Sequence, residues 1–411
     1  MNIDSTQQLS ILLFGGIVKV TEKEYIGKVK TGKNKDQDRF RNVTKEVYIK
    51  GLGLTPQDRW KTAKEGIYQT NEKIIGVIAK ANKGDASEIC KLILKIRGLS
   101  KAISTYYNST EELTYDCDNC VHQQYVQVFL PTGRLSCTGI NAQNQPKPPS
   151  KVTQHFVSRY DNGCITIVDY RALEPRVEAE NSQDPQLIDD VNNDRDPHCK
   201  HLALAEHKSY DEVVELVKSS SVWDSKRSKI KGFTFSNQYL ASNYTMSQNS
   251  GLSIIEIEQI VEARKLEYPK LYQWHENNEK EVEAKGFYRN MLGREFYFKK
   301  YPGKYHYQKP SYSKNEISNY KSQGTGWDVA GIMIGRFWRE KALHNRDKYV
   351  MINTIHDNLM LDCREEYLEQ AKVDLKMLEN WKEVCYELFK YKWIVNIKVD
   401  IKYGKSWYDC F

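Results

Sequence analysis

The stretch Cys164-Ile165-Thr166-Ile167-Val168, followed by Asp169, is the clearest strand signal in the sequence. A short run of apolar and β-branched residues is typical of a strand buried in a sheet. The carboxylate comes directly at the end of this run. A charged side chain in that position indicates a functional site, and the alternative is an ordinary turn carboxylate at a strand end.

A second carboxylate has the same setting 188 positions further along the chain. Residues 349–352 and 359–361 are expected to form a hairpin whose turn carries His356-Asp357-Asn358. If one sheet brings Asp169 and Asp357 together, their oxygens form a site for two hard divalent cations. Such a pair of ions serves in-line displacement at phosphorus.

A stripe of four side chains lies between these aspartates: Arg227, Lys231, Phe235 and Tyr239 recur every four residues in a run that is expected to be one helix. Four-residue steps keep side chains on one slowly drifting face. The two cations suit phosphate oxygens, and the two rings suit a sugar and a base. Taken alone, the stripe is better explained as an amphipathic surface helix. Placed between two aspartates, it predicts a nucleoside triphosphate site.

The composition sets broad limits. A chain of 411 residues exceeds the size at which one core stops growing, so we expect two or three subdomains. Lys and Arg outnumber Asp and Glu by 61 to 54, a net charge of +7 that is compatible with a polyanionic partner without requiring one. The sequence has no run of about 18 apolar residues and no signal-peptide pattern, which predicts a soluble, intracellular protein without membrane attachment.

The nine cysteines are too scattered for a disulfide framework and are expected to be reduced. Cys117, Cys120 and His122 supply three zinc ligand types without an obvious fourth. An ordinary loop leading into a strand is therefore favoured over a zinc site.

The expected elements change in type along the chain. Residues 1 to about 110 are predicted to be helical at 7–14, 59–82 and 86–107, with a polar stretch at 25–44. That stretch holds six basic residues and is either a solvated loop or a mobile arm on a nucleic-acid backbone. The six are Lys28, Lys30, Lys33, Lys35, Arg39 and Arg41.

Strand signals begin near residues 125–130, and residues 184–286 are predicted to be helix after helix. Asp184 and Asp196 precede prolines, which favours N-caps with Pro at the first helical position, and two Ser/Glu pairs fit capping boxes. These pairs are Ser209 with Glu212 and Ser253 with Glu256. Later elements are expected to be helices at 327–343 and 365–390 and a strand at 394–401.

Four blocks, in this order, resemble known motifs. Residues 132–136 (TGRLS) and 141–144 (NAQN) are similar to TGRLSS and NLQN, and residues 169–176 (DYRALEPR) are similar to DYSQIELR. Residues 227–239 keep the spacing R-x3-K-x3-F-x3-Y, and residues 355–358 (IHDN) are similar to VHDE. From about residue 97 onward, the chain thereby resembles the polymerase region of family A DNA polymerases, the group of bacterial DNA polymerase I and phage T7 polymerase.

The resemblance implies a fold and a domain order. The fold class would be α+β, a right-hand architecture with an antiparallel sheet in the palm. Residues 1–121 would form a helical thumb with the basic loop near 25–44. Residues 122–183 would form the first part of the palm, 184–295 the fingers, and 296–411 the second part of the palm.

The resemblance also implies roles at the reaction centre. Asp169 and Asp357 would ligate two Mg²⁺ ions, for which Mn²⁺ could substitute, and the carbonyl of Tyr170 would be a further ligand. Lys231 would protonate the leaving pyrophosphate. The triphosphate would be held by His198, Arg227 and Lys231.

Further roles concern the sugar and the DNA. Phe235 would pack under the sugar, Glu174 would block a 2′-hydroxyl, and Tyr239 would occupy the template-base position until the fingers close. Contacts to the minor groove suit an enzyme that accepts every base pair. The residues expected to touch the primer–template are Arg134, Asn141, Asn144, Asn319, Gln323 and His356.

The implied activity is template-directed addition of dNTPs to a primer 3′-end, in the cytoplasm of a bacterial cell or a phage-infected host and without secretion. The residues before Thr132 are expected to leave no room for a proofreading exonuclease. The expected partners are primer–template DNA and dNTPs, with a separate exonuclease or processivity factor as an additional possibility.

The chain departs from the family pattern at four positions. Asn358 stands where the family has Glu, and Leu240 where it commonly has Gly, after Tyr239. Pro175 predicts an extended Glu174. Gly232, inside the predicted stripe helix, should weaken that helix by about 1 kcal/mol relative to Ala.

Two alternatives to a polymerase remain at this level. A DNA-binding protein with a polymerase-like fold but without catalysis would account for Asn358 and Leu240. A two-metal nuclease would use both aspartates but gives no reason for the phosphate-binding stripe.

Overall fold

The computed structural model describes residues 2–28, 30, 36–127, 129–139, 141–148, 150–303 and 307–411. The chain divides into two compact units, Met1–Thr114 and Tyr115–Phe411, and each has its own hydrophobic core. Among the helices of the described residues, none combines the length and apolar character that a membrane span requires.

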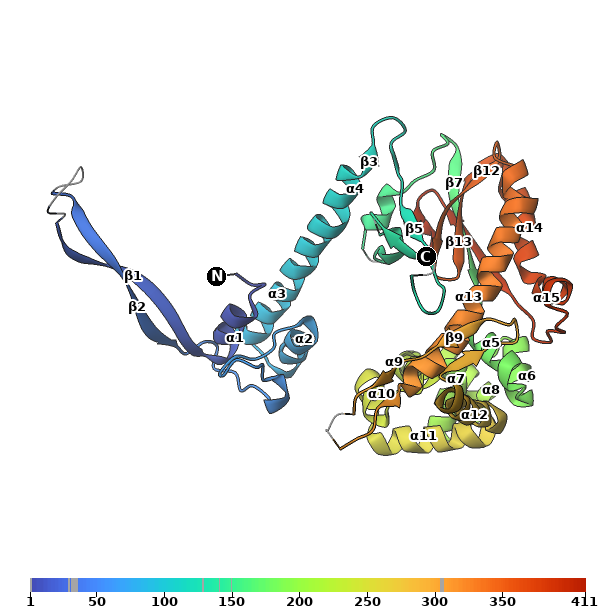
Figure 1. Cartoon of the computed structure of the whole chain (residues 1–411), viewed down its shortest axis with the longest axis horizontal. Helices are drawn as coiled ribbons and strands as arrows, with labels where there is room; N and C mark the ends of the chain where they lie inside the picture. Colours follow the sequence, from blue (N-terminus) through green and yellow to red (C-terminus); the bar gives the residue numbers. More distant parts are fainter. Residues whose placement is uncertain are drawn as a thin grey trace. The chain divides into compact units, whose positions relative to one another are not determined.

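The unit Met1–Thr114 contains helices around a small core (Figure 1). Helix α1, Thr6–Phe14, begins where the Ser5 hydroxyl accepts a hydrogen bond from the backbone of Gln8. The other helices are α2 (Glu72–Ala81), α3 (Asp85–Lys101), a π-helical turn (Ala102–Tyr107) and α4 (Asn108–Glu112). The core includes Leu9, Leu13, Ile75, Ile78, Cys90 and Ile93. The helices predicted at 7–14 and 86–107 are confirmed.

The helix predicted at 59–82 is wrong in its first part. Residues Asp58–Trp60 form only a short 3₁₀ turn, and the chain up to residue 71 is not helical. Helix α2 begins after Asn71, whose side chain accepts a hydrogen bond from the Ile74 N–H at 3.0 Å. An N-cap of this kind fixes the start of a helix, because it satisfies a backbone donor that lacks an intrahelical partner.

The prediction of a polar loop at 25–44 is also wrong. Strand β1, Gly16–Lys28, pairs antiparallel with β2, Asp38–Ile49, so Lys28, Arg39 and Arg41 belong to a long hairpin. Lys30 lies between the strands, and Lys33 and Lys35 lie outside the described residues.

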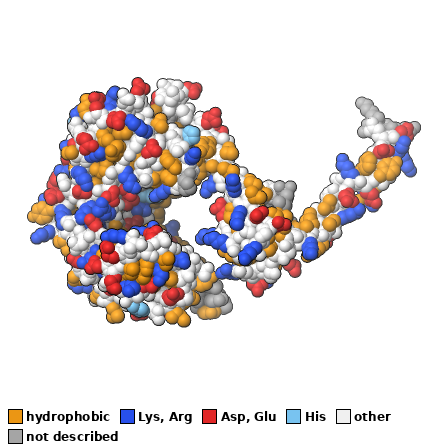
Figure 2. All heavy atoms as spheres, turned by 180° about the vertical axis from the view of Figure 1, so that it is seen from behind, with side chains coloured by type: hydrophobic (Ala, Val, Ile, Leu, Met, Phe, Trp, Pro, Cys, Tyr) orange, Lys and Arg blue, Asp and Glu red, His pale blue; other side chains and the backbone are white. Residues whose placement is uncertain are grey.

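The sequence pattern did not predict the hairpin because neither of its faces is buried. Figure 2 shows basic, acidic and apolar side chains mixed along its surface. Cross-strand ion pairs take the place of a core, with Arg41 Nε 2.6 Å from Glu24 and Lys45 Nζ 2.7 Å from Glu22. Strand prediction relies on one apolar face, which a solvated ribbon lacks.

The unit Tyr115–Phe411 is organised around a four-stranded antiparallel sheet with the order β12-β13-β7-β14. The strands are β7 (Gly163–Tyr170), β12 (Tyr349–Ile355), β13 (Asn358–Arg364) and β14 (Val399–Gly404). The predicted strand before Asp169 and the predicted hairpin around Asp357 are both confirmed. This arrangement matches the expected α+β class with an antiparallel sheet.

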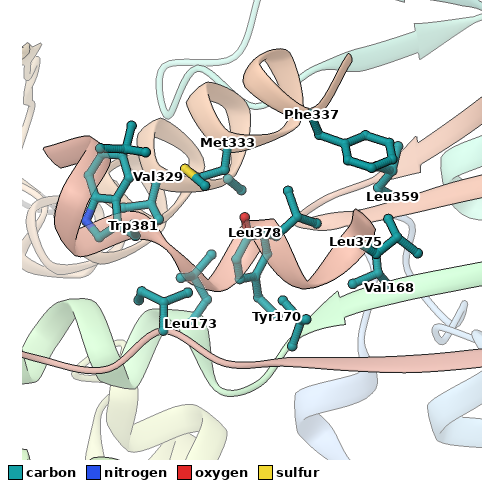
Figure 3. Close-up of a cluster of buried hydrophobic side chains, with 14 of the residues drawn as sticks. Val168, Tyr170, Leu173, Val329, Met333, Phe337, Leu359, Leu375, Leu378 and Trp381 are labelled. Atoms are coloured by element: carbon teal, nitrogen blue, oxygen red, sulfur yellow. The ribbon is translucent and has the colours of Figure 1, made fainter. Parts of the chain in front are cut away.

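Both faces of the sheet are covered. Val168, Tyr170 and Leu359 pack against Val329, Met333 and Phe337 of the long helix α13, Lys314–Glu340 (Figure 3). Leu375, Leu378 and Trp381 join the same core. On the opposite face, Ile165, Ile167 and Met360 meet Trp407 and Cys410. Burial of alternate side chains on both faces explains why β7 is a continuous apolar run.

A helical part follows β7, and its core includes Leu202, Ile230, Phe233 and Ile257. The predicted N-caps at Asp184 and Asp196 and both predicted capping boxes are confirmed. Its helices are α5 (Leu173–Ser182), α6 (Pro185–Asn192), α7 (Pro197–Glu206), α8 (Tyr210–Ser219), α9 (Ser221–Gln238), α10 (Asn243–Ser250), α11 (Ile254–Glu267) and α12 (Pro269–Lys285).

Short strand pairs complete the unit. β5 (Gln124–Val126) pairs with β6 (Ser136–Thr138), which places a strand where one was predicted near residue 125. The other short strands are β3 (Thr114–Tyr115) with β4 (Cys120–Val121), β8 (Phe287–Arg289) with β9 (Glu295–Tyr297), and β10 (Lys300–Tyr301) with β11 (Ser311–Tyr312).

Three predicted elements near the end of the chain have wrong limits. Helix α13 begins at Lys314, well before residue 327, and ends at Glu340. The single helix expected at 365–390 is two, α14 (Leu368–Leu375) and α15 (Trp381–Phe389), with a 3₁₀ turn between them. The last strand starts at Val399 and not at 394, because the backbone N–H groups of Ile394 and Val395 donate to Glu180.

Candidate active site

The sheet register brings the two predicted metal ligands together. β13 pairs with β7 so that Leu359 lies opposite Val168. Asp169 directly follows Val168, and Asp357 stands two residues before Leu359. Because the strands run antiparallel, both carboxylates lie at the same end of two neighbouring strands. They line one cavity of about 560 Å³.

Both carboxylates have a raised pKa. Burial, followed by the negative charge of Asp357, raises the pKa of Asp169 to about 6. The charge of Asp400 raises this pKa further, whereas the charges of Lys147 and Lys402 lower it. Burial raises the pKa of Asp357, and the nearby Arg134 opposes that shift. Of the described residues, no basic side chain forms an ion pair with either aspartate.

This unbalanced negative charge fits a divalent metal site. Mg²⁺ is commonly bound by one or two carboxylates together with substrate phosphates, and not by a complete cage of protein ligands. Within the described residues, no group of three or more His, Cys, Asp or Glu side chains is arranged to hold a metal. Two facing carboxylates without a cationic partner are therefore the right donors for ions whose other ligands come from the substrate.

Glu174 connects three parts of the cavity wall. It lies in the first turn of α5 and accepts hydrogen bonds from Arg134 Nη2 at 2.8 Å and from the Tyr239 hydroxyl at 2.5 Å. Gln238 adds a longer contact to the same carboxylate at 3.3 Å. Burial, followed by the charge of Glu174, raises the pKa of Tyr239. The extended backbone expected for Glu174 before Pro175 is wrong, because the first turn of a helix tolerates proline.

The predicted stripe lies on one helix, as expected. Arg227, Lys231 and Phe235 belong to α9, and Tyr239 follows its last residue. Phe235 is 58% exposed and lines the cavity, with its ring centroid 5.6 Å from that of His198. A sugar or base entering the cavity would therefore meet an uncovered aromatic ring.

The three predicted phosphate ligands differ in their surroundings. Arg227 forms a forked ion pair with Asp196, with N–O distances of 2.8 and 2.5 Å, and neither Arg227 nor Lys231 lines the cavity. His198 does line it. Burial lowers the pKa of His198, and the charges of Arg227 and Lys231 lower it further, so both cations lie near the ring.

Three residues that line the cavity carry a buried polar atom without a hydrogen-bond partner among the described residues: Nδ1 of His198, the hydroxyl of Tyr170 and Nε of Arg134. The side chain of Tyr170 packs in the apolar core under α13 (Figure 3). A buried polar group without a partner costs roughly 1–3 kcal/mol, so each of these three atoms lowers the stability of the fold.

Only some of the residues predicted to touch the primer–template lie in the cavity lining. Arg134 and His356 line the cavity, and His356 holds a positive φ of 58° in the turn before Asp357. The remaining ones lie outside the cavity lining: Asn141 caps a 3₁₀ turn that ends at Asn144, and Asn319 and Gln323 lie one turn apart on α13. Their contacts with DNA stay predictions.

The zinc alternative at residues 117–122 gains no support. His122 Nε2 lies 2.8 Å from a carboxylate oxygen of Asp118, and Cys120 lies in β4. The loop leading into a strand, which was favoured from the sequence, is what the structure has at this place.

Two side chains near Asp169 or Glu174 were not predicted from the sequence. Gln238 contacts Glu174, although it lies outside the four-residue stripe. Asp400 pairs with Asp169 across β14 and β7 and is bound by Arg171. No motif marks Asp400, because only the pairing of β14 with β7 brings it there.

Comparisons with known proteins agree with this geometry. The family model described as DNA polymerase family A matches residues 41–409. DNA polymerase I of Bacillus subtilis is 28% identical over 369 residues, which is 88% of this chain and 38% of that protein. DNA polymerase I of Geobacillus stearothermophilus is 27% identical over 355 residues, or 85% of this chain and 37% of that protein.

A solved structure has the same fold. The POL domain of Pol1 from M. smegmatis, in complex with a DNA primer-template and dNTP, superposes with a TM-score of 0.72 at 18% identity. The match covers 100% of this chain and 62% of that one. The chain spans less than half the length of the curated relatives that it matches. With the family model matching nearly all of its residues, the chain belongs to DNA polymerase family A.

Proposed function

We propose that this chain catalyses template-directed addition of dNTPs to the 3′-end of a DNA primer. One observation carries the proposal: Asp169 and Asp357 line the same cavity as His198, Phe235 and Tyr239. Paired carboxylates account for metal-assisted chemistry at phosphorus, and His198 with the two aromatic residues of the stripe accounts for a nucleotide. A shared cavity unites the two halves of a nucleotidyl-transfer site.

Asp169 and Asp357, with the carbonyl of Tyr170, would hold two Mg²⁺ ions, or Mn²⁺ in their place. When bound, these ions supply Lewis acidity at the primer hydroxyl and charge neutralisation at the phosphates. The side chains of this chain mainly bind and orient, because phosphoryl transfer asks little covalent chemistry of a protein.

His198, Arg227 and Lys231 would bind the triphosphate, with Arg227 exchanging Asp196 for phosphate oxygens. Lys231 would deliver a proton to the leaving pyrophosphate. Phe235 would pack under the sugar, and Glu174 would occupy the space that a 2′-hydroxyl needs. Tyr239, now bonded to Glu174, would leave its position when a template base enters.

The contacts to DNA and the domain roles belong to the same proposal. His356 would steady the primer terminus, Arg134 would follow the minor groove together with Gln323, and four amides would contact the duplex. These are Asn141, Asn144, Asn319 and Gln323. Residues 1–121 would act as the thumb, 184–295 as the fingers, and 122–183 with 296–411 as the palm.

Primer extension with the wild type and Asp357→Ala tests the proposal. We expect the wild type to extend a labelled primer with dNTPs and Mg²⁺, and the variant to lose at least about 1,000-fold in rate, since one of two metal-binding carboxylates is gone. Asp211→Ala, in the exposed first turn of α8, is the control and should retain the wild-type rate.

Three outcomes would contradict the proposal or part of it. Duplex binding without incorporation by the wild type would identify a DNA-binding protein that has lost catalysis. Shortening of the primer when dNTPs are omitted would identify a nuclease. Near-normal extension by Asp357→Ala would remove the proposed role of that residue.

A further inference from the structure

The strand that leads to Asp357 lies at the edge of the sheet. Among the described residues, β12 pairs only with β13 in the order β12-β13-β7-β14, so its outer backbone groups have no ladder partner there. The ladder is also interrupted: Met351 pairs with Leu361 and Asn353 with Met360, which leaves Ile352 as an extra residue. A bulge at an edge weakens the hold on the turn that follows.

Three side chains from another segment take over the missing hydrogen bonds. Gln123 Nε2 donates to the carbonyl of Ile352 at 2.7 Å. The Tyr125 hydroxyl accepts from the backbone N–H of Thr354 at 3.1 Å and donates to the side chain of Asn353. Gln143 Nε2 donates to the carbonyl of Thr354 at 3.1 Å. We call Gln123, Tyr125 and Gln143 the edge brace.

Two residues of the edge brace are also hydrogen-bonded to each other. Gln123 Nε2 also donates to the Tyr125 hydroxyl at 3.0 Å, so one amide holds both the bulge carbonyl and the phenol. Asn353 is buried, with 8% of its surface exposed. Hydrogen bonds that are partly buried and shared in this way restrict motion more than isolated surface bonds do.

We propose that Tyr125 is a positioning residue that, through the edge brace, holds the Asp357 turn against Asp169. Only Ile355 and His356 separate Thr354 from Asp357, so movement at the bulge passes directly to the carboxylate. The inference deepens the proposed function and rests on it for its kinetic consequences, whereas the bracing itself is a structural statement.

The test compares two tyrosines of the same unit that each lose one hydroxyl. Tyr125→Phe removes the phenol from the bulge. The control is Tyr349→Phe, at the other end of β12, where the fully buried hydroxyl donates to Asp374 at 2.8 Å. Both variants lose a hydrogen bond to a polar partner, but only Tyr125 contacts the bulge before Asp357.

Single-turnover incorporation, measured against dNTP and Mg²⁺ concentrations, gives the kinetic readout. For Tyr125→Phe we expect the maximal rate to fall between about tenfold and 100-fold, because small displacements of catalytic groups have effects of this size. The Mg²⁺ concentration for half-maximal rate should rise, and dNTP half-saturation should stay within about twofold. Tyr349→Phe should leave all three values near those of the wild type.

Amide hydrogen exchange gives a readout that needs no activity. The Thr354 N–H should exchange faster in Tyr125→Phe and not in Tyr349→Phe. The double variant Tyr125→Phe with Asn353→Ala should lose less rate than the product of the two single losses, since both remove one interaction. If the wild type incorporates no nucleotide, the proposed function is wrong. The exchange rate of the Thr354 N–H would still show whether Tyr125 holds the bulge.

Two results would overturn the inference. One is equal kinetics for Tyr125→Phe and Tyr349→Phe. The other is unchanged exchange at Thr354 in Tyr125→Phe.

Discussion

Single residues that depart from the family pattern have local structural roles. The side-chain oxygen of Asn358 accepts a hydrogen bond from the Ile355 N–H at 3.0 Å, which closes the turn that carries Asp357. Leu240 adopts a positive φ of 50° directly after α9 and Tyr239. Glycine has no steric penalty there, which explains why the family commonly has Gly at this place. Neither Asn358 nor Leu240 lines the cavity.

The buried carboxyl group of Glu178 predicts that the stability of the folded protein depends on pH. It is buried in α5, and burial raises its pKa to about 7 although the Ser322 hydroxyl donates to it at 2.8 Å. The folded state therefore holds a proton that the unfolded chain releases near pH 4.5. The stability linked to this proton is present at low pH and is lost as the pH rises through about 7.

Glu178→Gln should remove this dependence. Between pH 5 and pH 8, the unit Tyr115–Phe411 of the wild type should lose about 2–3 kcal/mol of unfolding free energy relative to the variant. Urea unfolding at several pH values measures the difference. Parallel curves for the two proteins would show that Glu178 does not titrate in this range.

At the scale of elements, α5 shows what local sequence does not reveal. Arg176, 1% exposed, donates to the carbonyls of Arg171 and Asn396, and Glu180 accepts from the N–H groups of Ile394 and Val395. These charged side chains hold the segment before β14, and their partners in that segment, Ile394, Val395 and Asn396, lie more than 200 residues away. The sequence marks the helix start, but not what its buried charges bind.

The packing of helix α9 explains why Gly232 is present, although glycine was expected to weaken this helix. A Cβ at this position would lie 2.1 Å from the carbonyl oxygen of Asn249, because α10 packs closely against α9. The residue that lowers helix propensity is thus required by packing. Helix propensity describes an isolated helix and contains no information about a neighbouring backbone.

Gly232→Ala should therefore destabilise the protein, by about 1–3 kcal/mol, despite the better helix former. Gly335→Ala is the matched control, because Gly335 lies on α13 with nothing within 4 Å of a new Cβ. The control should stabilise by about 0.5–1 kcal/mol. Thermal unfolding of both variants measures the two signs, and stabilisation by Gly232→Ala would refute the packing explanation.

At the scale of the whole molecule, the chain has two units with separate cores. Ile75 is fully buried in the core of Met1–Thr114, whereas β7 lies in the core of Tyr115–Phe411. Separate cores allow separate unfolding, so a single free energy of unfolding does not describe such a chain.

Ile75→Ala should destabilise only the first unit, by about 2–5 kcal/mol. Amide hydrogen exchange should become faster in α2 and α3 and stay unchanged in β7 and β13. Cys90→Ala, in the same core, should act in the same direction with a smaller effect. Equal loss of protection in β7 would show that the two units unfold together.

The sequence by itself determined the local elements that carry the candidate site. Strand β7, the Asp357 hairpin and the stripe on α9 are each encoded in short segments, because apolar patterning and four-residue spacing act locally. The tertiary structure alone decided what lies between distant segments: the register that joins Asp169 to Asp357, the cross-strand Asp400, the ion pair of Arg227 and the edge brace. It also revealed the solvated hairpin, whose strands are stabilised by pairing across the chain and by no apolar face that a local pattern could show.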